Sequence, residues 1–147
     1  MQERVRRNTS GNINREVDRK IRESIDLYSS LDKEAINKRI KMLGKEWDVE
    51  RALEVNMPIV AMIGLSLGSF VNPWWLLFPA IVMIFFLEHA IQGWCPPLPI
   101  FRSLGFRTRQ EIEKERYALK LLRGDFDALL TERNIESAEI YRAVAKS

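Results

Sequence analysis

Three residues near the middle of the chain have side chains that could do chemistry. Glu88 and His89 close a long apolar run, and Cys95 follows shortly after them. The thiolate is the reactive form of cysteine, and a nearby base or positive charge favours it. His89 or Arg102 could supply that influence, so Cys95 is a weak candidate for thiol or sulfur chemistry. We favour a packed, unreactive thiol, because the sequence shows neither an oxyanion hole nor a third member of a triad.

Glu88 and His89 are the only ionisable residues that adjoin the apolar run. A charge inside a bilayer is costly, so such residues are candidates for a functional role by default. Both lie close to Trp94, however, where we expect the membrane interface, and Glu88 can pair with Arg51 or Arg102. We therefore favour a structural role for both residues.

The sequence contains no motif for a cofactor, a metal ion or a nucleic acid. One Cys and one His are too few for a multi-ligand zinc site. We find no phosphate-binding loop, nucleophile elbow or dinucleotide fingerprint. The 23 basic and 20 acidic residues are interleaved, as on solvated helices, and do not form a phosphate-binding patch. We expect a protein that is not an enzyme and that binds no cofactor or nucleic acid.

A charge-free stretch over residues 57–87 dominates the organisation of the chain. It predicts two transmembrane helices, at about 57–71 and 74–94, with a turn at 69–73. About 20 residues cross a hydrocarbon core of about 30 Å. The second segment is long enough, whereas the first must extend back through Leu53 or thin the bilayer. A re-entrant pair of helices and a buried soluble pair are the alternatives.

The ends of the two segments carry features of a membrane boundary. Trp47, Trp74, Trp75 and Trp94 are placed as interface anchors. Thirteen Lys and Arg residues precede the stretch, ten follow it, and none lies in the turn. The excess of basic residues in cytoplasmic segments therefore predicts an inner-membrane, multi-pass protein with both termini in the cytoplasm.

Small residues lie along the first apolar segment. Ala61, Gly64 and Gly68 include a G-x-x-x-G pair, which lets two helix backbones approach closely. We expect these residues to pack the two helices of one hairpin against each other. A subunit interface in a homodimer is the alternative.

The flanking segments predict further helices. Residues 1–11 are expected to form a flexible basic arm, followed by a helix from Asn12 with an apolar stripe and a second helix from Asp32 to Gly44. Three prolines argue against helix over 94–102. Beyond them, a capping box at 108–111 opens a helix that stops at Gly124, and a short helix is expected near 137–146.

The fold class we expect is an all-α membrane protein. It consists of a two-helix transmembrane hairpin with amphipathic cytoplasmic helices at both ends. The predicted domains are an N-terminal helical arm (1–46), the hairpin (47–105) and a C-terminal helical segment (106–147).

Four short motifs carry a resemblance to a known family. They are "ERAL" at 50–53, Pro-Trp-Trp at 73–75, Gly-Trp-Cys-Pro at 93–96 and Leu-Gly at 104–105. With the apolar segments between them, they resemble the YgaP-like transmembrane domain of bacterial inner-membrane proteins. Some members of that family are fused to a rhodanese, a sulfur transferase. This chain has no rhodanese domain, so the resemblance implies a dimeric membrane hairpin of unassigned biochemical role and no enzyme activity.

We therefore expect a membrane anchor or scaffold that oligomerises in the lipid bilayer and presents its cytoplasmic helices to a protein partner. One alternative is a thiol- or sulfur-handling accessory protein that uses Cys95, with His89 or Glu88 assisting. Another is a conduit for small ions or anions at an oligomer axis, although Ser66 is the only polar side chain in the predicted membrane core.

Overall fold

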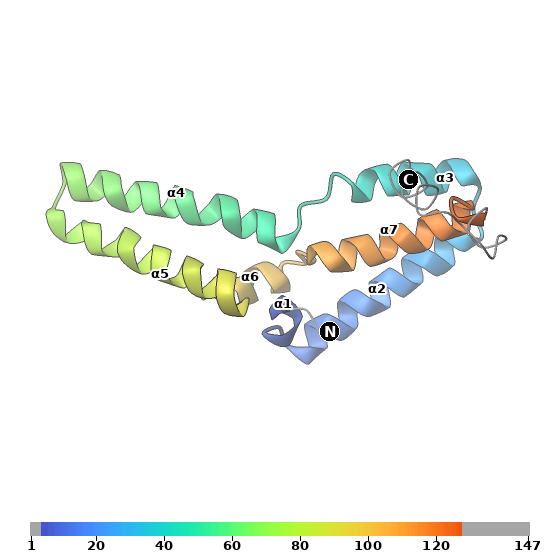
Figure 1. The fold of residues 1–147 in the computed structure, drawn as a ribbon, viewed down its shortest axis with the longest axis horizontal. Helices are drawn as coiled ribbons and strands as arrows, with labels where there is room; N and C mark the ends of the chain where they lie inside the picture. The colour runs from blue at the N-terminus through green and yellow to red at the C-terminus, as the bar shows by residue number, and fades with distance from the viewer. Residues whose placement is uncertain (1–3, 128–147) are drawn as a thin grey trace, which may run out of the picture. The chain divides into compact units, whose positions relative to one another are not determined.

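The computed structural model describes residues 4–127, and over that range the chain is helical and contains no β-strand (Figure 1). The predicted all-α class is confirmed for this part of the chain, whereas the helix predicted near 137–146 lies outside it. The elements, in chain order, are α1 (Arg4–Arg7), α2 (Gly11–Ser29), α3 (Lys33–Leu43), α4 (Val49–Phe70), the 3-10 helix η1 (Pro73–Leu76), α5 (Leu77–Gln92), α6 (Leu98–Ser103) and α7 (Arg109–Arg123).

The described residues form two compact units. Unit 1 contains residues 4–17 and 47–110, and unit 2 contains residues 18–46 and 111–127. Each unit therefore combines segments from both sides of the charge-free stretch. The three consecutive domains expected from the sequence stay a prediction.

Helix α4 begins well before the charge-free stretch. The Asp48 carboxylate accepts a hydrogen bond from the Arg51 amide at 2.7 Å and so caps the helix N-terminus. The helix then runs for 22 residues, with Pro58 inside it. The first apolar segment therefore extends back through Leu53, which is one of the two possibilities that its sequence predicted, and η1 and α5 together span 20 residues.

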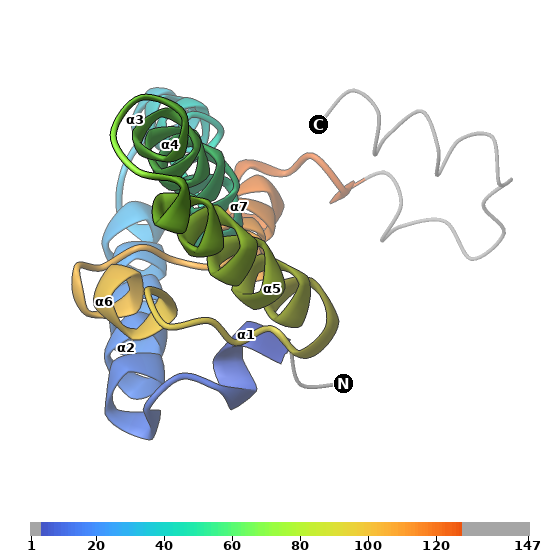
Figure 2. The same cartoon turned by 90° about the vertical axis from the view of Figure 1, so that its left-hand side faces the viewer.

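The second apolar segment begins as a 3-10 helix. The Asn72 side chain accepts a hydrogen bond from the Trp74 amide at 3.0 Å, and Pro73 stands at the first position of η1. Helix α5 follows and lies beside α4 (Figure 1). Figure 2 looks along these two helices from the end that carries their connecting turn.

Two segments expected to lack helix contain one. Helix α6 starts at Leu98, directly after Pro97, and contains Pro99 in its first turn. Proline is tolerated there because the first amides of a helix have no intrahelical acceptor. In the expected basic arm, residues 4–7 form α1, and its Val5 is buried in the core of unit 1.

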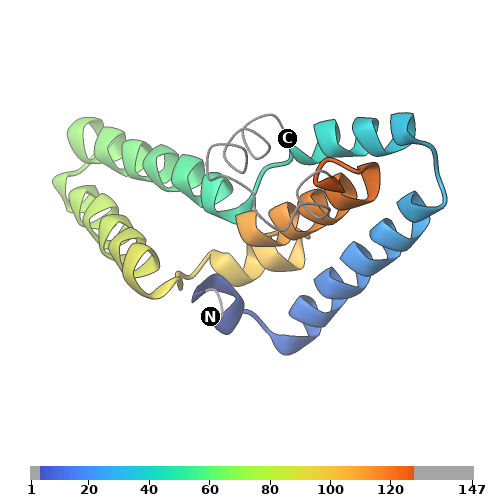
Figure 3. The ribbon, with the colours of Figure 1, turned by 45° about the vertical axis from the view of Figure 1, so that its right-hand side comes forward.

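Each unit has its own hydrophobic core. The core of unit 1 consists of Val5, Val49, Leu53, Met57, Ala61, Val82, Cys95 and Leu98. In unit 2, α3 and α7 pack together (Figure 3), and Tyr28 of α2 packs against their core. That core consists of Ile36, Ile40, Leu43, Ile112 and Leu119. Helix α3 begins next to Asp32, as predicted, and the Asp32 side chain caps it, while Gly124, with a φ of 94°, follows the end of α7.

Candidate functional site

We call the end where α4 begins and α5 finishes, with α1 and α6 packed there, the base of the α4–α5 pair. Arg4 Nη1 donates hydrogen bonds to the carbonyl oxygens of Ala90 at 2.5 Å and Ile91 at 3.2 Å. Asn8 Nδ2 donates to the Gln92 carbonyl at 2.9 Å. The last carbonyls of a helix lack intrahelical donors, so α1 caps the C-terminus of α5.

Gly93 makes this close approach possible. Its φ of 78° lies in the left-handed region. A Cβ at this position would lie 2.6 Å from Arg4 Cβ and 2.9 Å from the Arg4 carbonyl carbon. Both the backbone conformation and the packing of α1 therefore require glycine here.

The start of α4 is held by the segment after α6. The Val49 amide donates to the Arg107 carbonyl at 2.8 Å, and the Arg109 amide donates to Glu50 Oε2 at 3.3 Å. The Arg51 guanidinium lies over the Trp47 ring, 4.7 Å from its centroid. This cation–π contact places one arginine and one aromatic ring together at the base.

Arg102 is buried in unit 1. Its Nη1 donates to the Phe106 carbonyl at 2.9 Å, and its Nη2 donates to Asn14 Oδ1 at 3.1 Å. It thereby connects α6, the loop after it and the start of α2. The sequence did not reveal this role, because Asn14 is distant in the chain and has no pattern that would mark it as a partner.

The three residues singled out for chemistry also lie at the base. Cys95 is a free, fully buried thiol, and burial raises its pKa, with the Glu88 charge adding to the effect. A raised pKa favours the neutral thiol over the nucleophilic thiolate. His89 is half-buried and has Arg4 and Glu54 as charged neighbours. Within residues 4–127, no three His, Cys, Asp or Glu side chains form a group that could hold a metal ion.

The structure places the predicted small residues on the face of α4 that packs against η1 and α5. Ala61, Gly64 and Gly68 are all buried. A Cβ on Gly64 would lie 2.8 Å from Phe78 Cδ1, and one on Gly68 would lie 2.7 Å from Leu76 Cγ. The two glycines therefore allow close helix packing within one chain.

The predicted tryptophan anchors lie at both ends of the helix pair. Trp74 and Trp75 are in η1, with 77% and 45% of their surface exposed. At the base, Trp47 is exposed and Trp94 is half-buried. The Trp75 and Phe78 rings meet edge to face, with centroids 6.3 Å apart.

The basic residues of the two units differ in type. All eight basic residues of unit 1 are arginine: Arg4, Arg6, Arg7, Arg15, Arg51, Arg102, Arg107 and Arg109. In the described part of unit 2, seven of the twelve basic residues are lysine: Lys20, Lys33, Lys38, Lys41, Lys45, Lys114 and Lys120. The arginine preference is therefore confined to the unit that contains the apolar helices.

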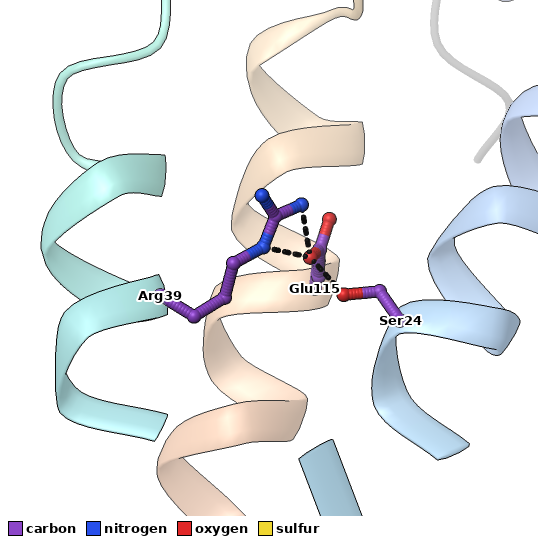
Figure 4. A network of polar contacts seen from close by, with 3 residues as sticks. All are labelled: Ser24, Arg39 and Glu115. Atoms are coloured by element: carbon purple, nitrogen blue, oxygen red, sulfur yellow. Dashed lines mark hydrogen bonds and ion pairs between the residues drawn. The ribbon is translucent and has the colours of Figure 1, made fainter. Parts of the chain in front are cut away.

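Unit 2 contains a buried ionic network (Figure 4). Glu115 of α7 is fully buried and its Oε1 accepts three hydrogen bonds. Arg39 of α3 donates from Nε at 2.9 Å and from Nη2 at 2.7 Å, and Ser24 Oγ of α2 donates at 2.6 Å. The interleaved charges of α7 are typical of a solvated face, so the sequence did not identify Glu115 as a core residue.

Two helical stretches, Val49–Phe70 and Pro73–Gln92, are long and apolar enough to cross a membrane. Only 28% and 11% of their most apolar windows are buried inside the structure. No protein-family model, curated protein or solved structure matches the chain.

Proposed function

We propose that this chain is a bacterial inner-membrane protein in which α4 and α5 form a transmembrane hairpin, with both ends of the chain in the cytoplasm. The hairpin anchors unit 2, which offers a helical surface to a protein partner. The protein is a scaffold and not an enzyme. The resemblance of four short motifs to the YgaP-like transmembrane domain is in keeping with this proposal.

The observation that carries this proposal is the apolar outer surface of the helix pair. Large apolar side chains of α4 and α5 are exposed, among them Ile59, Met62, Ile63, Leu65, Phe70, Leu77, Ile81, Met83, Ile84, Leu87 and Ile91. Soluble monomers rarely expose a contiguous apolar patch of more than a few hundred Å². A lipid environment gives these side chains apolar neighbours, and the backbone polar groups are already satisfied within the helices.

The helix lengths suit a bilayer. At about 1.5 Å per residue, the 22 residues of α4 extend about 33 Å. The 16 residues of α5 extend about 24 Å, and the 3-10 helix η1 adds about 8 Å. Both lengths match a hydrocarbon core of about 30 Å.

The distribution of charge supports the orientation. The turn between the two helices carries no charged residue, whereas the base carries arginines. Cytoplasmic segments next to membrane helices are enriched in Lys and Arg. A cytoplasmic base and a turn on the opposite side follow from this rule.

The packing of α4 also limits how two copies could form a homodimer. Ala61, Gly64 and Gly68 face α5 of the same chain. A second copy would therefore meet another face of α4, where Ile59 and Met62 are exposed. Association through lipid-facing side chains is compatible with the proposed scaffold role.

Arginine substitutions at exposed apolar positions test the membrane proposal. Ile63 of α4 and Ile84 of α5 have 54% and 65% of their surface exposed. In water, Ile63→Arg and Ile84→Arg would be harmless, whereas in the bilayer centre each would cost about 2.5–3.5 kcal/mol. The measurement is the fraction of the full chain that stays in membranes after alkaline carbonate extraction.

We expect the wild-type chain to resist extraction and each arginine variant to be released or degraded. Leu27→Arg is the matched control, because Leu27 of α2 in unit 2 has 58% of its surface exposed. This control should remain in the membrane. A wild-type chain recovered in the soluble fraction, or arginine variants that resist extraction fully, would refute the proposal.

A further inference from the structure

The base of the α4–α5 pair carries three exposed guanidinium groups. Arg7 in α1, Arg51 in the first turn of α4 and Arg109 at the start of α7 are all exposed. Arg51 contacts the Trp47 ring. Within residues 4–127, none of these three guanidinium groups has a carboxylate partner.

The three arginines belong to one end of the helix pair. Arg7 is in the helix that caps α5, and Arg51 directly follows Glu50, whose carboxylate binds the Arg109 amide. This end is also where the apolar helices begin and finish. Phosphate groups of a bilayer that surrounds α4 and α5 would therefore lie at the level of these guanidinium groups.

Two carboxylates at the base have hydrogen-bond partners inside unit 1. Asp48 caps α4 through the Arg51 amide, and Glu50 accepts from the Arg109 amide. Glu54 is a charged neighbour of His89. Asp48 and Glu50 therefore have partners within the fold, Glu54 and Glu88 are further acidic residues at the base, and the guanidinium groups of Arg7, Arg51 and Arg109 are exposed there.

We propose that the base binds the phosphate groups of anionic phospholipids through Arg7, Arg51 and Arg109. Arginine offers a planar fork that binds phosphate oxygens through two hydrogen bonds, whereas lysine acts as a point charge. All eight basic residues of unit 1 are arginine, which fits a phosphate ligand. Trp47, stacked under Arg51, places an aromatic ring at the headgroup level. This inference rests on the proposed membrane insertion.

Native mass spectrometry of the full chain in nanodiscs tests the proposal. The nanodiscs contain phosphatidylcholine alone or mixed with phosphatidylglycerol, and the measurement is the ratio of the two lipids retained on the protein. The test variant is R7Q/R51Q/R109Q. The matched control, K33Q/K38Q/K45Q, removes the same number of exposed positive charges from unit 2.

We expect the wild type to retain phosphatidylglycerol in preference to phosphatidylcholine. Each arginine near an anionic surface contributes about fivefold to lipid affinity. The affinity of the triple glutamine variant for phosphatidylglycerol should therefore be lower on the order of 100-fold. The control should match the wild type. R7K/R51K/R109K keeps the charge and should retain less lipid than the wild type but more than the glutamine variant.

The proposal would be overturned if every variant enters the nanodiscs and retains phosphatidylglycerol and phosphatidylcholine in the same ratio as the wild type. A control that loses as much phosphatidylglycerol as the test variant would also overturn it, as would displacement of the lipid by inorganic phosphate. A wild-type chain that does not enter neutral nanodiscs would refute the proposed membrane insertion instead. The two failures are therefore distinguishable.

Discussion

Unit 1 leaves many more large apolar side chains exposed than the described part of unit 2 does. In unit 1, α4 and α5 leave large apolar side chains such as Met62 and Ile84 exposed. In unit 2, Glu115 and Lys120 are buried together with the apolar core. A helix in water must bury its apolar stripe against another element. The exposed apolar side chains of α4 and α5 are what the proposed insertion of this helix pair into a bilayer predicts.

The largest change in unfolding free energy is expected when the ionic network of unit 2 is disrupted. Arg39→Met removes the cation and leaves the Glu115 carboxylate buried without it. We expect unit 2 to lose about 3–5 kcal/mol of unfolding free energy, because removing one partner of a buried ion pair is costly. Denaturant titration of the detergent-solubilised chain, followed by circular dichroism, measures this loss.

Two further variants control this prediction. Arg19→Met breaks the exposed pair with Glu23 and should cost less than about 1 kcal/mol. The double variant R39M/E115L replaces both charged groups by apolar ones and should recover most of the stability. Equal losses for Arg39→Met and Arg19→Met would show that Glu115 is not a buried charge.

A smaller effect is expected from the glycines of unit 1. Gly68→Val places a side chain where Leu76 Cγ lies 2.7 Å from the added Cβ. Overpacking of this kind typically costs about 1–3 kcal/mol, and here it would push α4 away from η1. Thermal unfolding in detergent measures the change. Ser66→Val, at an exposed position of the same helix, should leave the midpoint of thermal unfolding unchanged. An equal shift of the midpoint in both variants would contradict the observed packing.

The capping of α5 by α1 should contribute less to stability than the packing of the two glycines. Arg4→Ala removes two hydrogen bonds to the end of α5, at about 0.5–1.5 kcal/mol each. We expect faster cleavage of the N-terminal segment by a protease added to detergent-solubilised protein. Arg7→Ala changes an exposed neighbour in the same helix and should be cleaved like the wild type. If the two variants are cleaved equally fast, α1 does not depend on Arg4.

The thiol of Cys95 should be slow to react. Burial raises its pKa, and each unit of such a rise lowers the thiolate fraction at a given pH about tenfold. Maleimide should therefore label the folded chain at least about tenfold more slowly than the denatured chain, with the rate rising as the pH increases. The buried neutral thiol of Cys95 also contributes to folding stability. This contribution is present below the pKa of the thiol in the unfolded chain, and it is lost as the pH rises through the raised pKa of the folded chain. Rapid labelling of the folded chain at neutral pH would favour the sulfur-handling alternative.

Local rules predicted much of the fold. The helix start at Asp32, the turn at 69–73 and the helix stop at Gly124 all have short-range chemical signals. Hydrophobic periodicity placed the buried stripe of α2, including Val17 and Ile21. The charge-free stretch located both apolar helices.

Two of the errors arose where contacts distant in sequence determine the structure, and the error at α6 arose from a local rule for proline. Helix α1 forms in a segment with no helical periodicity, because Val5 packs into the core of unit 1. Helix α6 forms although Pro99 lies within it, because proline is tolerated in the first turn. Similarly, the pairing of Arg39 with Glu115 joins residues 76 positions apart, and no local pattern distinguishes these charges from solvated ones.

Labelling of single cysteines tests the proposed transmembrane hairpin most directly. In a Cys95→Ala background, Asn72→Cys reports on the turn and Lys45→Cys reports on unit 2. We predict that a membrane-impermeant maleimide added to intact cells with a permeabilised outer membrane labels Asn72→Cys, and labels Lys45→Cys only after lysis. Labelling of both positions only after lysis, or of both before it, would contradict the hairpin with a cytoplasmic base.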